Sequence, residues 1–593
     1  MASRTLSPVF GVTQSLSGKA WHWRGGNMDI GQGDAGSADD IVTQLLLSRG
    51  VPPADIDRHR QPTMRAFLPD PSIFRDMESA ADRIAQAVLT QETVTIYGDY
   101  DVDGATSSAL MIRLMRMLGA QAEYYIPDRL LEGYGPSGAA LVKLAEKGSS
   151  LIVTVDCGAM AFEALEMAHN VGVDVIVVDH HKCAHELPKT VALVNPNRLD
   201  EDDEAAAHGH LAAVGVAFLL AIAVVRTLRQ RGFFKNRGEP DLMSLLDLVA
   251  LGTVADVAAL HGLNRAFVAQ GLKVMARRQN VGMAALTDAS RLKRAPVCSD
   301  LGFALGPRIN AGGRVGESTL GVRLLTTEDA DEARAIAGQL SALNEDRRAI
   351  EASVQEAAEA QIAAQHNRAV IVVSGNDWHP GVIGIVAGRI KEKTGKPTIV
   401  IASDASNGKG SGRSIPGVDL GAAIIAARSE GLLIAGGGHA MAAGLTIAAD
   451  AQDAFAQWID AKLNVAVGQA QASRTLKLDL AVAAGGLTPE LVTRMDDAGP
   501  YGMSWPGPKL AVGPVHLIKA DIVGADHLRL IVGSPDGRSM KAIAFRAAET
   551  ELGQALLHGA KGRRLWLAGR AKIDDWNATP AAELHLEDAA WAD

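Results

Sequence analysis

Three short apolar runs, separated by helix-forming segments, constrain the fold of this 593-residue chain more than any other feature. The runs lie at residues 93–97, 151–155 and 173–178, and helical spacing follows at 105–118 and 161–170. Continuous apolar runs are typical of strands buried on both faces, and strand–helix alternation favours a parallel sheet covered by helices. The sequence therefore predicts a doubly wound α/β domain.

Each apolar run is followed by acidic or imidazole side chains. The carboxyl ends of parallel strands meet at one edge of a sheet, where ligands bind. Acids packed this closely repel one another unless a cation lies among them, so we expect a metal site at this edge. The residues are Asp99, Asp101 and Asp103 after the first run, Asp156 after the second, and Asp179, His180 and His181 after the third.

Other interpretations remain for the parts of this pattern. The first three acids alone would fit a solvated acidic turn or an EF-hand fragment, although an EF-hand loop ends in Glu and residues 105–108 lead into an apolar helix. Asp256 is a lone acid in the apolar stretch 248–257, and a buried carboxylate needs a partner, so it is either a helix cap or a further metal ligand.

Carboxylates and imidazole without thiolates favour Mn²⁺ or Mg²⁺ over Zn²⁺. The number of acids exceeds what one ion needs, which indicates two ions that share a bridging carboxylate. Two metals about 3.5–4 Å apart are an arrangement for phosphoryl transfer, in which one activates water and the other stabilises the leaving oxygen.

Composition limits the setting of this chemistry. Hydrophobic residues make up 47% and charged residues 21%, as in globular proteins, and a net charge of −10 argues against an overall electrostatic footprint for nucleic acid. The three cysteines show no metal-ligand spacing and suit a reducing compartment. The N-terminus lacks an apolar signal segment, and the longest apolar run, 211–225, is short for a membrane span, so we expect a buried core helix and a cytoplasmic protein.

Segments 98–104, 155–158, 179–181 and 253–256 resemble the four motifs of the DHH phosphoesterase superfamily. Within it, the chain is most similar to the branch of single-strand-specific 5′→3′ DNA exonucleases, from about residue 40 to its end. Further segments carry that similarity: 126–129, 132–135, 306–314, 378–389, 412–416 and 437–445. One segment departs from the branch, because Ser504 and Trp505 stand where it has Gly-Asn.

The resemblance implies hydrolysis of single-stranded DNA from the 5′ end to 5′-mononucleotides, in DNA recombination and repair. Asp156 would bridge the ions, His181 would contact the scissile phosphate, Asp179 would orient a neighbouring histidine, and Asp99 is the residue of the metal set that best fits a supporting role. Residues implied to bind substrate phosphate are Arg308, Asn310 and Arg314. The alternatives are a related phosphodiesterase for short oligonucleotides or cyclic dinucleotides, and a non-catalytic DNA-binding scaffold.

The rest of the chain predicts further domains. Two polar, glycine-rich loops can approach a phosphate closely, and they supply Ser411, Arg413, Gly437, Gly438 and His439. Short strand-like pieces after residue 475 fit a small β-barrel, by resemblance an OB-fold, in which Lys561, Arg563, Arg564, Arg570 and Lys572 could contact single-stranded DNA and Trp566 is either core or a stacking platform.

We therefore expect an α/β chain in which a parallel-sheet DHH domain and a smaller DHHA1 domain are joined by a long helix and followed by an OB-fold. The resemblance also implies a cleft too narrow for a duplex, a monomer without membrane contact, and cooperation with a helicase and a single-strand-binding protein. The expected order is a disordered tail (1–36), a helical segment (37–90), the DHH domain (91–327), the connecting helix (328–367), the DHHA1 domain (368–465) and the barrel (466–593).

Overall fold

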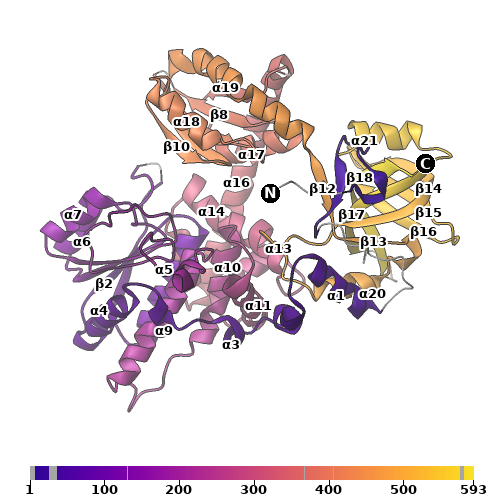
Figure 1. The fold of residues 1–593 in the computed structure, drawn as a ribbon. Coiled ribbons are helices and arrows are strands. Elements are labelled where there is room, and N and C mark those ends of the chain that lie inside the picture. Colours follow the sequence, from indigo (N-terminus) through magenta and orange to yellow (C-terminus); the bar gives the residue numbers. More distant parts are fainter. Residues whose placement is uncertain are drawn as a thin grey trace. The chain divides into compact units, whose positions relative to one another are not determined.

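The computed structural model describes residues 7–25, 37–129, 131–365, 367–404, 406–574 and 580–592. The chain divides into two compact units (Figure 1). One comprises Pro62–Ile350 with Pro500–Pro506. The other contains the described residues of Met1–Gln61, Glu351–Gly499 and Gly507–Asp593.

The first unit is built on a five-stranded sheet of order β3-β2-β4-β5-β6, in which every pairing is parallel. Alternate residues of β2 face opposite cores: Ile96 packs with helices of one face and Tyr97 with helices of the other. Both faces are thus covered, which explains the continuous apolar runs and confirms the doubly wound domain. The strands are β2 (Val94–Gly98), β3 (Ala122–Tyr125), β4 (Leu151–Val155), β5 (Asp174–Val178) and β6 (Ala192–Val194).

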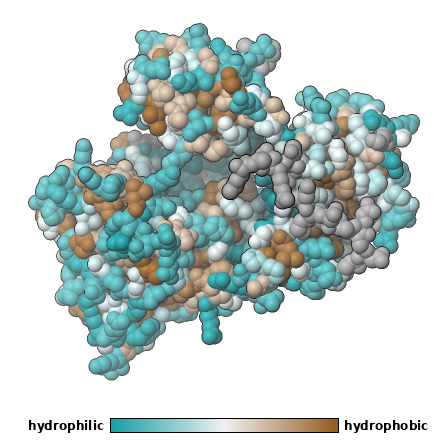
Figure 2. Space-filling model, in the orientation of Figure 1, coloured by the Kyte–Doolittle hydropathy of each residue, from teal (hydrophilic) through white to brown (hydrophobic). Residues whose placement is uncertain are grey.

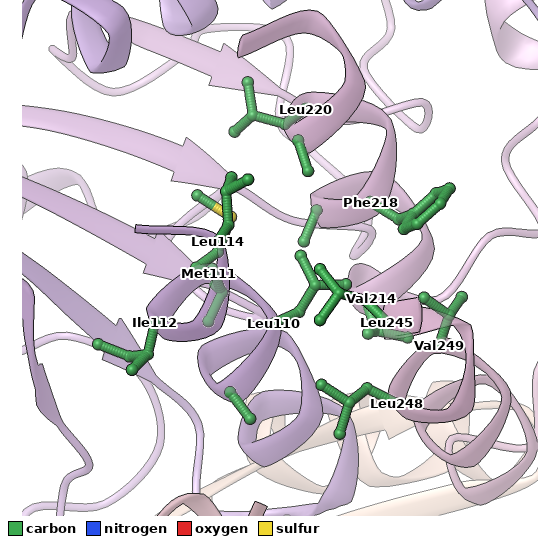
Figure 3. Close-up of a cluster of buried hydrophobic side chains, with 14 of the residues drawn as sticks. Leu110, Met111, Ile112, Leu114, Val214, Phe218, Leu220, Leu245, Leu248 and Val249 are labelled. Carbon is green, nitrogen blue, oxygen red and sulfur yellow. The ribbon is translucent and has the colours of Figure 1, made fainter. Parts of the chain in front are cut away.

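Three helices form the main core beside this sheet: α5 (Val102–Met117), α9 (Ala213–Gln230) and α10 (Leu246–Ala255). Figure 3 shows Leu110 of α5, Val214 of α9 and Leu248 of α10 near one another in this core, and all three are buried. Burying each such side chain contributes about 1.5–3 kcal/mol. Among the described residues, α9 is the one helix long and apolar enough to span a membrane, but 78% of it is buried inside the protein. This confirms the expected core helix.

Shorter helices complete the unit, and the long helix α16 (Ala330–Ile362) runs from it into the second unit. At 33 residues α16 is about 50 Å long, close to the predicted connecting helix. The others are α3 (Met64–Phe67), α4 (Met77–Thr90), α6 (Gly138–Glu146), α7 (Phe162–Asn170), α8 (Asp203–Ala206), α11 (Gly262–Ala276), α12 (Val281–Ala289), α13 (Cys298–Asp300), α14 (Gly306–Val315) and α15 (Leu320–Thr326).

The second unit contains a mixed five-stranded sheet of order β10-β11-β9-β8-β7 with α17 (Ile383–Thr394), α18 (Leu420–Ser429) and α19 (Gln452–Ala472). The prediction of two glycine-rich loops is wrong, because both segments are strands. Glycine disfavours isolated strands, but here each segment pairs antiparallel with β11. The strands are β7 (Ile371–Asn376), β8 (Thr398–Ser403), β9 (Asn407–Arg413), β10 (Ala435–His439) and β11 (Ala442–Ala448).

The same unit holds a closed five-stranded barrel, because β14 pairs with both β15 and β17. This confirms the predicted barrel. Arg563 lies over the Trp591 ring and Arg570 forms an ion pair with Glu587. The elements are β13 (Leu480–Val482), α20 (Pro489–Asp496), β14 (Leu510–Val523), β15 (His527–Gly533), β16 (Ser539–Ala544), α21 (Glu551–Gln554), β17 (Arg564–Asp574) and β18 (Ala581–Trp591).

The prediction of a disordered N-terminal tail is wrong for residues 7–25. Strand β1 (Ala20–Trp23) pairs in parallel with β12 (Thr475–Leu478), and the fully buried Trp21 donates to Asp588 Oδ2 at 3.0 Å. Phe10 stacks on Trp566 at 3.9 Å, so one face of that ring is covered. Apolar anchors rather than regular periodicity order this segment; residues 1–6 and 26–36 lie outside the described residues. Helices α1 (Ala38–Ser48) and α2 (Ile56–Arg60) follow.

Candidate metal centre

Sheet register brings the acidic strand ends together. Gly98 pairs with Val155, and Val155 pairs with Val178, so β2, β4 and β5 end level with one another. Backbone pairing continues one residue beyond β4, because Asp156 N donates to Val178 O at 3.0 Å. The residues after these three strands therefore meet at one edge, as the sequence predicted.

Two acids of the first motif also hold helix starts. Asp101 is the N-cap of α5, where its Oδ1 accepts from the backbone of Asp103 and Gly104. Asp103 is fully buried, and its two oxygens accept from Ala213 and Val214 at the start of α9 (2.7 and 3.0 Å). Both carboxylates face the positive end of a helix, which stabilises their charge and fixes their direction.

His180 is oriented as a metal-binding imidazole. Its Nδ1 lies 3.0 Å from the carbonyl oxygen of Leu211. Because Nδ1 carries the proton of that hydrogen bond, the lone pair of Nε2 is available to a metal ion. That Nε2 is buried, makes no hydrogen bond to a described residue and lies 3.3 Å from Asp156 Oδ1 and 3.9 Å from Asp103 Oδ2.

The ligand atoms fall into three overlapping groups, each within 4.8 Å. Asp156 is shared by two groups and His180 by two, so the groups form one continuous centre. The groups are Asp99–Asp101–Asp156, Asp156–His180–His181 and Asp103–His180–Asp256. All six predicted metal residues therefore lie together.

The charge balance of the centre fits a bound cation. Burial, followed by the charge of Asp101, raises the pKa of Asp99 and of Asp256 to about 7. Burial also raises the pKa values of Asp103 and Asp156, with a neighbouring carboxylate as the next cause in each. Asp99 Oδ1 is buried without a partner among the described residues. Divalent cations compensate carboxylates and an unprotonated imidazole arranged in this way.

Asp156 has a left-handed backbone, with φ of 61°. A non-glycine residue adopts this conformation at a cost of about 1–3 kcal/mol, and such strain gathers at functional sites. This backbone conformation turns the chain sharply after β4 and leaves the Asp156 side chain 4% exposed inside the centre. Close packing elsewhere requires Gly104, since a Cβ there would lie 2.4 Å from the carbonyl oxygen of Asp99.

Asp179 does not belong to any of the three groups. Its Oδ1 accepts from His181 Nδ1 at 2.8 Å and from two backbone N–H groups, and its Oδ2 accepts from Ala159 N. Burial lowers the pKa of His181, but the Asp179 hydrogen bond and charge outweigh it and raise this pKa to about 8. Asp179 thus orients His181 and favours its charged form.

One contact was missed from sequence. The Tyr134 hydroxyl donates to the carbonyl oxygen of Asp156 at 3.1 Å and lies 3.2 Å from His181 Nδ1. Tyr134 belongs to segment 132–135, which carried the resemblance without a role for the tyrosine.

The predicted phosphate-binding residues lie in two places. Arg308, Asn310 and Arg314 are on α14, which approaches the metal loop so closely that a Cβ at Gly313 would lie 2.7 Å from the carbonyl oxygen of Tyr100. Arg308 donates to Ser341 Oγ and to the carbonyl oxygen of Ala304.

The other predicted phosphate residues belong to the mixed sheet. Arg413 Nη1 donates to Ser411 Oγ at 3.1 Å on β9. A Cβ at Gly384 would lie 2.9 Å from both side chains, so the start of α17 lies against them. A helix N-terminus beside an arginine is suited to an anion. Gly437, Gly438 and His439 form the end of β10.

The parallel sheet with these acids at its carboxyl edge fits the DHH class of phosphoesterases, and residues 93–253, which contain the sheet, match the model of that family. Family models match three parts of the chain: "DHH family, N-terminal domain" at residues 93–253, "DHHA1 domain" at 367–464 and "RecJ OB domain" at 478–588.

Individual relatives sharpen this class. The single-stranded-DNA-specific exonuclease RecJ of Dickeya dadantii is 36% identical over 572 residues, which cover 92% of this chain and 95% of that protein. Its Escherichia coli counterpart is 36% identical over 85% of this chain and 89% of its own length. The crystal structure of Thermus thermophilus RecJ with Mn²⁺ matches with a TM-score of 0.74 at 28% identity, over 93% of this chain and 75% of that one. The chain therefore belongs to the RecJ family.

Proposed function

We propose that this chain is a single-stranded-DNA-specific 5′→3′ exonuclease that releases 5′-mononucleotides with two Mn²⁺ or Mg²⁺ ions, in DNA recombination and repair. The overlap of the three ligand groups through Asp156 and His180 carries this proposal. Membership of the RecJ family supports single-stranded DNA as the substrate. The Thermus thermophilus relative has been solved with each of the two metals.

The acidic cluster divides naturally into two cation sites. Asp99 and Asp101 with Asp156 would hold one ion, and Asp103, His180 and Asp256 the other, with Asp156 between them. When bound, such ions supply an activated water and neutralise charge on the phosphate. The α5 and α9 helix starts hold Asp101 and Asp103 rigidly, which fixes the geometry of the centre.

His181 would stabilise the charge that develops on the scissile phosphate. The Asp179 hydrogen bond and charge raise the pKa of His181 to about 8, which favours the charged imidazole that can donate from Nε2 while Nδ1–H is held by Asp179. The remaining candidates would bind DNA phosphates: Arg308, Asn310 and Arg314 on α14, and Ser411, Arg413, Gly437, Gly438 and His439 on the mixed sheet.

The proposal extends to the setting of the enzyme. The protein acts in the cytoplasm as a monomer on single-stranded DNA, together with a helicase and a single-strand-binding protein. The division into a DHH domain at 91–327, a connecting helix at 328–367, a DHHA1 domain at 368–465 and an OB-fold domain from 466 is part of it, and the family matches at 93–253, 367–464 and 478–588 support it.

End-blocked substrates test this function. A long single strand carries streptavidin at its 5′ or its 3′ end, and released nucleotides are separated by chromatography with Mn²⁺ present. We expect 5′-mononucleotides from the free and 3′-blocked strands, and little product from the 5′-blocked strand or a blunt duplex. Asp101→Ala should abolish release.

Three results would contradict the proposal. Degradation of only the 5′-blocked strand would reverse the polarity. Activity confined to oligonucleotides of a few residues or to cyclic dinucleotides would favour a related phosphodiesterase. DNA binding without any hydrolysis would favour a scaffold, and full activity of Asp101→Ala would remove the site assignment.

A further inference from the structure

A short segment far along the chain packs onto the metal-binding unit. Residues 500–506, the docking turn, belong to the same compact unit as Pro62–Ile350, although the chain on both sides of the turn belongs to the other unit. Two backbone hydrogen bonds between Gly502 and Trp505 close the turn, at 2.9 and 3.2 Å. It contains Ser504 and Trp505, which stand where the resemblance leads us to expect Gly-Asn.

The docking turn holds the loop between α10 and α11 by backbone and side-chain contacts. Leu260 N donates to the carbonyl oxygen of Met503 at 2.9 Å. The buried Arg265 donates to the carbonyl oxygen of Pro500 at 3.1 Å, and its guanidinium carbon lies 5.5 Å from the Trp505 ring. Trp505 also packs against the apolar cluster of Leu260, Val268 and Cys298.

The loop that is held follows a candidate metal ligand directly. Asp256 ends α10, and the next residue, Val257, has φ of 61°. A β-branched residue in this region is strained, and strain of this kind persists only where the surroundings enforce the conformation. The docking turn contacts this loop at Leu260, three residues after Val257.

Hydrogen bonds of Asn264 also connect this loop to the segment that supports the metal centre. The fully buried Asn264 donates to the carbonyl oxygens of Ala259 (3.1 Å) and His210 (2.6 Å). His210 begins the stretch whose next residues hold His180 and Asp103. Loop 257–261 thus lies between the docking turn and the backbone frame of the centre.

We propose that the docking turn is a positioning element of the metal centre, in which Trp505 acts through Arg265 and Leu260 to keep Asp256 beside His180. The inference rests on the proposed function, since it takes Asp256 as a ligand. Groups that support a metal ligand typically change metal affinity about 10–100-fold when they are removed.

Mn²⁺ binding by the full chain tests this role, with isothermal titration as the readout and thermal unfolding in EDTA as the measure of stability. We expect Trp505→Ala to weaken one Mn²⁺ ion about tenfold and to leave the other unchanged. Trp505→Phe should restore the affinity because it keeps the aromatic face. The matched control is Trp458→Ala, which removes a half-buried tryptophan of α19 and should leave both affinities unchanged.

Asp256→Ala separates the two levels of inference. Selective loss of the same ion in Asp256→Ala and Trp505→Ala supports the positioning role. Loss in Asp256→Ala with normal binding in Trp505→Ala overturns the docking-turn proposal alone, as does equal weakening of both ions in Trp505→Ala with a lowered melting temperature. Normal binding in Asp256→Ala overturns the ligand assignment, and the positioning role with it.

Discussion

The parallel sheet that ends in the metal centre and the mixed sheet of the second unit bring polar chemistry to a sheet in different ways. In the first, β2 and β4 are buried throughout and the acids begin only after the strands end. In the second, the polar and glycine residues lie within β9 and β10 themselves. A residue that follows a strand can be substituted without altering the packing of the strand itself. A glycine within a strand also packs against its neighbours, so its substitution affects packing as well as function.

The mixed sheet shows this double use within one strand. A Cβ at Gly410 would lie 2.6 Å from Leu445 Cδ1, so this glycine faces the core. A Cβ at Gly437 or Gly444, which pair across β10 and β11, would meet nothing within 4 Å. Function should therefore separate from strand packing in the first sheet, and in the second only at particular glycines. On the face shown in Figure 2, hydrophobic residues form small patches among hydrophilic ones.

The largest effect is expected from Asp156→Ala. It removes the carboxylate shared by two ligand groups, so hydrolysis of single-stranded DNA should fall at least about 1,000-fold, because metal ions supply several kcal/mol of transition-state stabilisation. Steady-state nucleotide release measures the loss. Asp174→Ala, at the amino end of β5, is the control and should keep activity within about twofold. Similar losses in both variants would contradict the assignment of the metal centre to the carboxyl ends of the strands.

Metal binding should change stability strongly in the first unit. Mn²⁺ at about 100 times its dissociation constant should add about 2.7 kcal/mol per ion to the free energy of unfolding. In EDTA, Asp99 and Asp256 have pKa values raised from 3.8 to about 7, so they stabilise the fold only while protonated. Stability in EDTA should thus fall by on the order of 1–3 kcal/mol as the pH rises from about 5 to about 8. Urea unfolding measures both effects. If the free energy of unfolding depends on pH equally with and without Mn²⁺, the assignment of Asp99 and Asp256 to the metal centre is contradicted.

The same contrast explains what could be predicted from the sequence. The strands β2, β4 and β5 and the meeting of Asp99, Asp156 and His180 followed from apolar runs and the geometry of parallel sheets, which are local signals. Strand β9, with its glycine-rich sequence, has no such signal, because its pairing with β8 and β11 comes from residues far along the chain.

Two further features depended on tertiary contacts. The first is the ordering of residues 7–25, which depends on Trp21 and its bond to Asp588 at the other end of the chain. The second is the docking turn, in which Trp505 contacts Arg265 and the cluster of Leu260, Val268 and Cys298, and these contacts lead to the loop after Asp256. No spacing rule in the sequence relates residues 505 and 265.

A smaller effect tests the packing of the mixed sheet. A Cβ at Gly421, on α18, would lie 2.8 Å from backbone atoms of Gly438 and His439, so Gly421→Ala should lower the free energy of unfolding by about 1–3 kcal/mol. Gly388→Ala is the matched control, because it lies within α17 with nothing within 4 Å of its Cβ and should gain about 0.5–1 kcal/mol. Urea unfolding measures both changes. Equal changes in the two variants would show that close approach does not decide the outcome.

The smallest effect is expected from Gly437→Ala, which isolates function within the mixed sheet. The added methyl group has open space, so the unfolding midpoint should stay within about 0.5 kcal/mol of the parent value. If the DNA backbone approaches β10 at this glycine, the methyl group should raise KM for single-stranded DNA about two- to fivefold, equivalent to less than about 1 kcal/mol, and leave kcat unchanged. Gly444→Ala, on the neighbouring strand, tests how far this contact extends. An unchanged KM in both variants would mean that these glycines of β10 and β11 do not contact DNA. Of the two sheets, only the parallel one with its metal centre would then carry function.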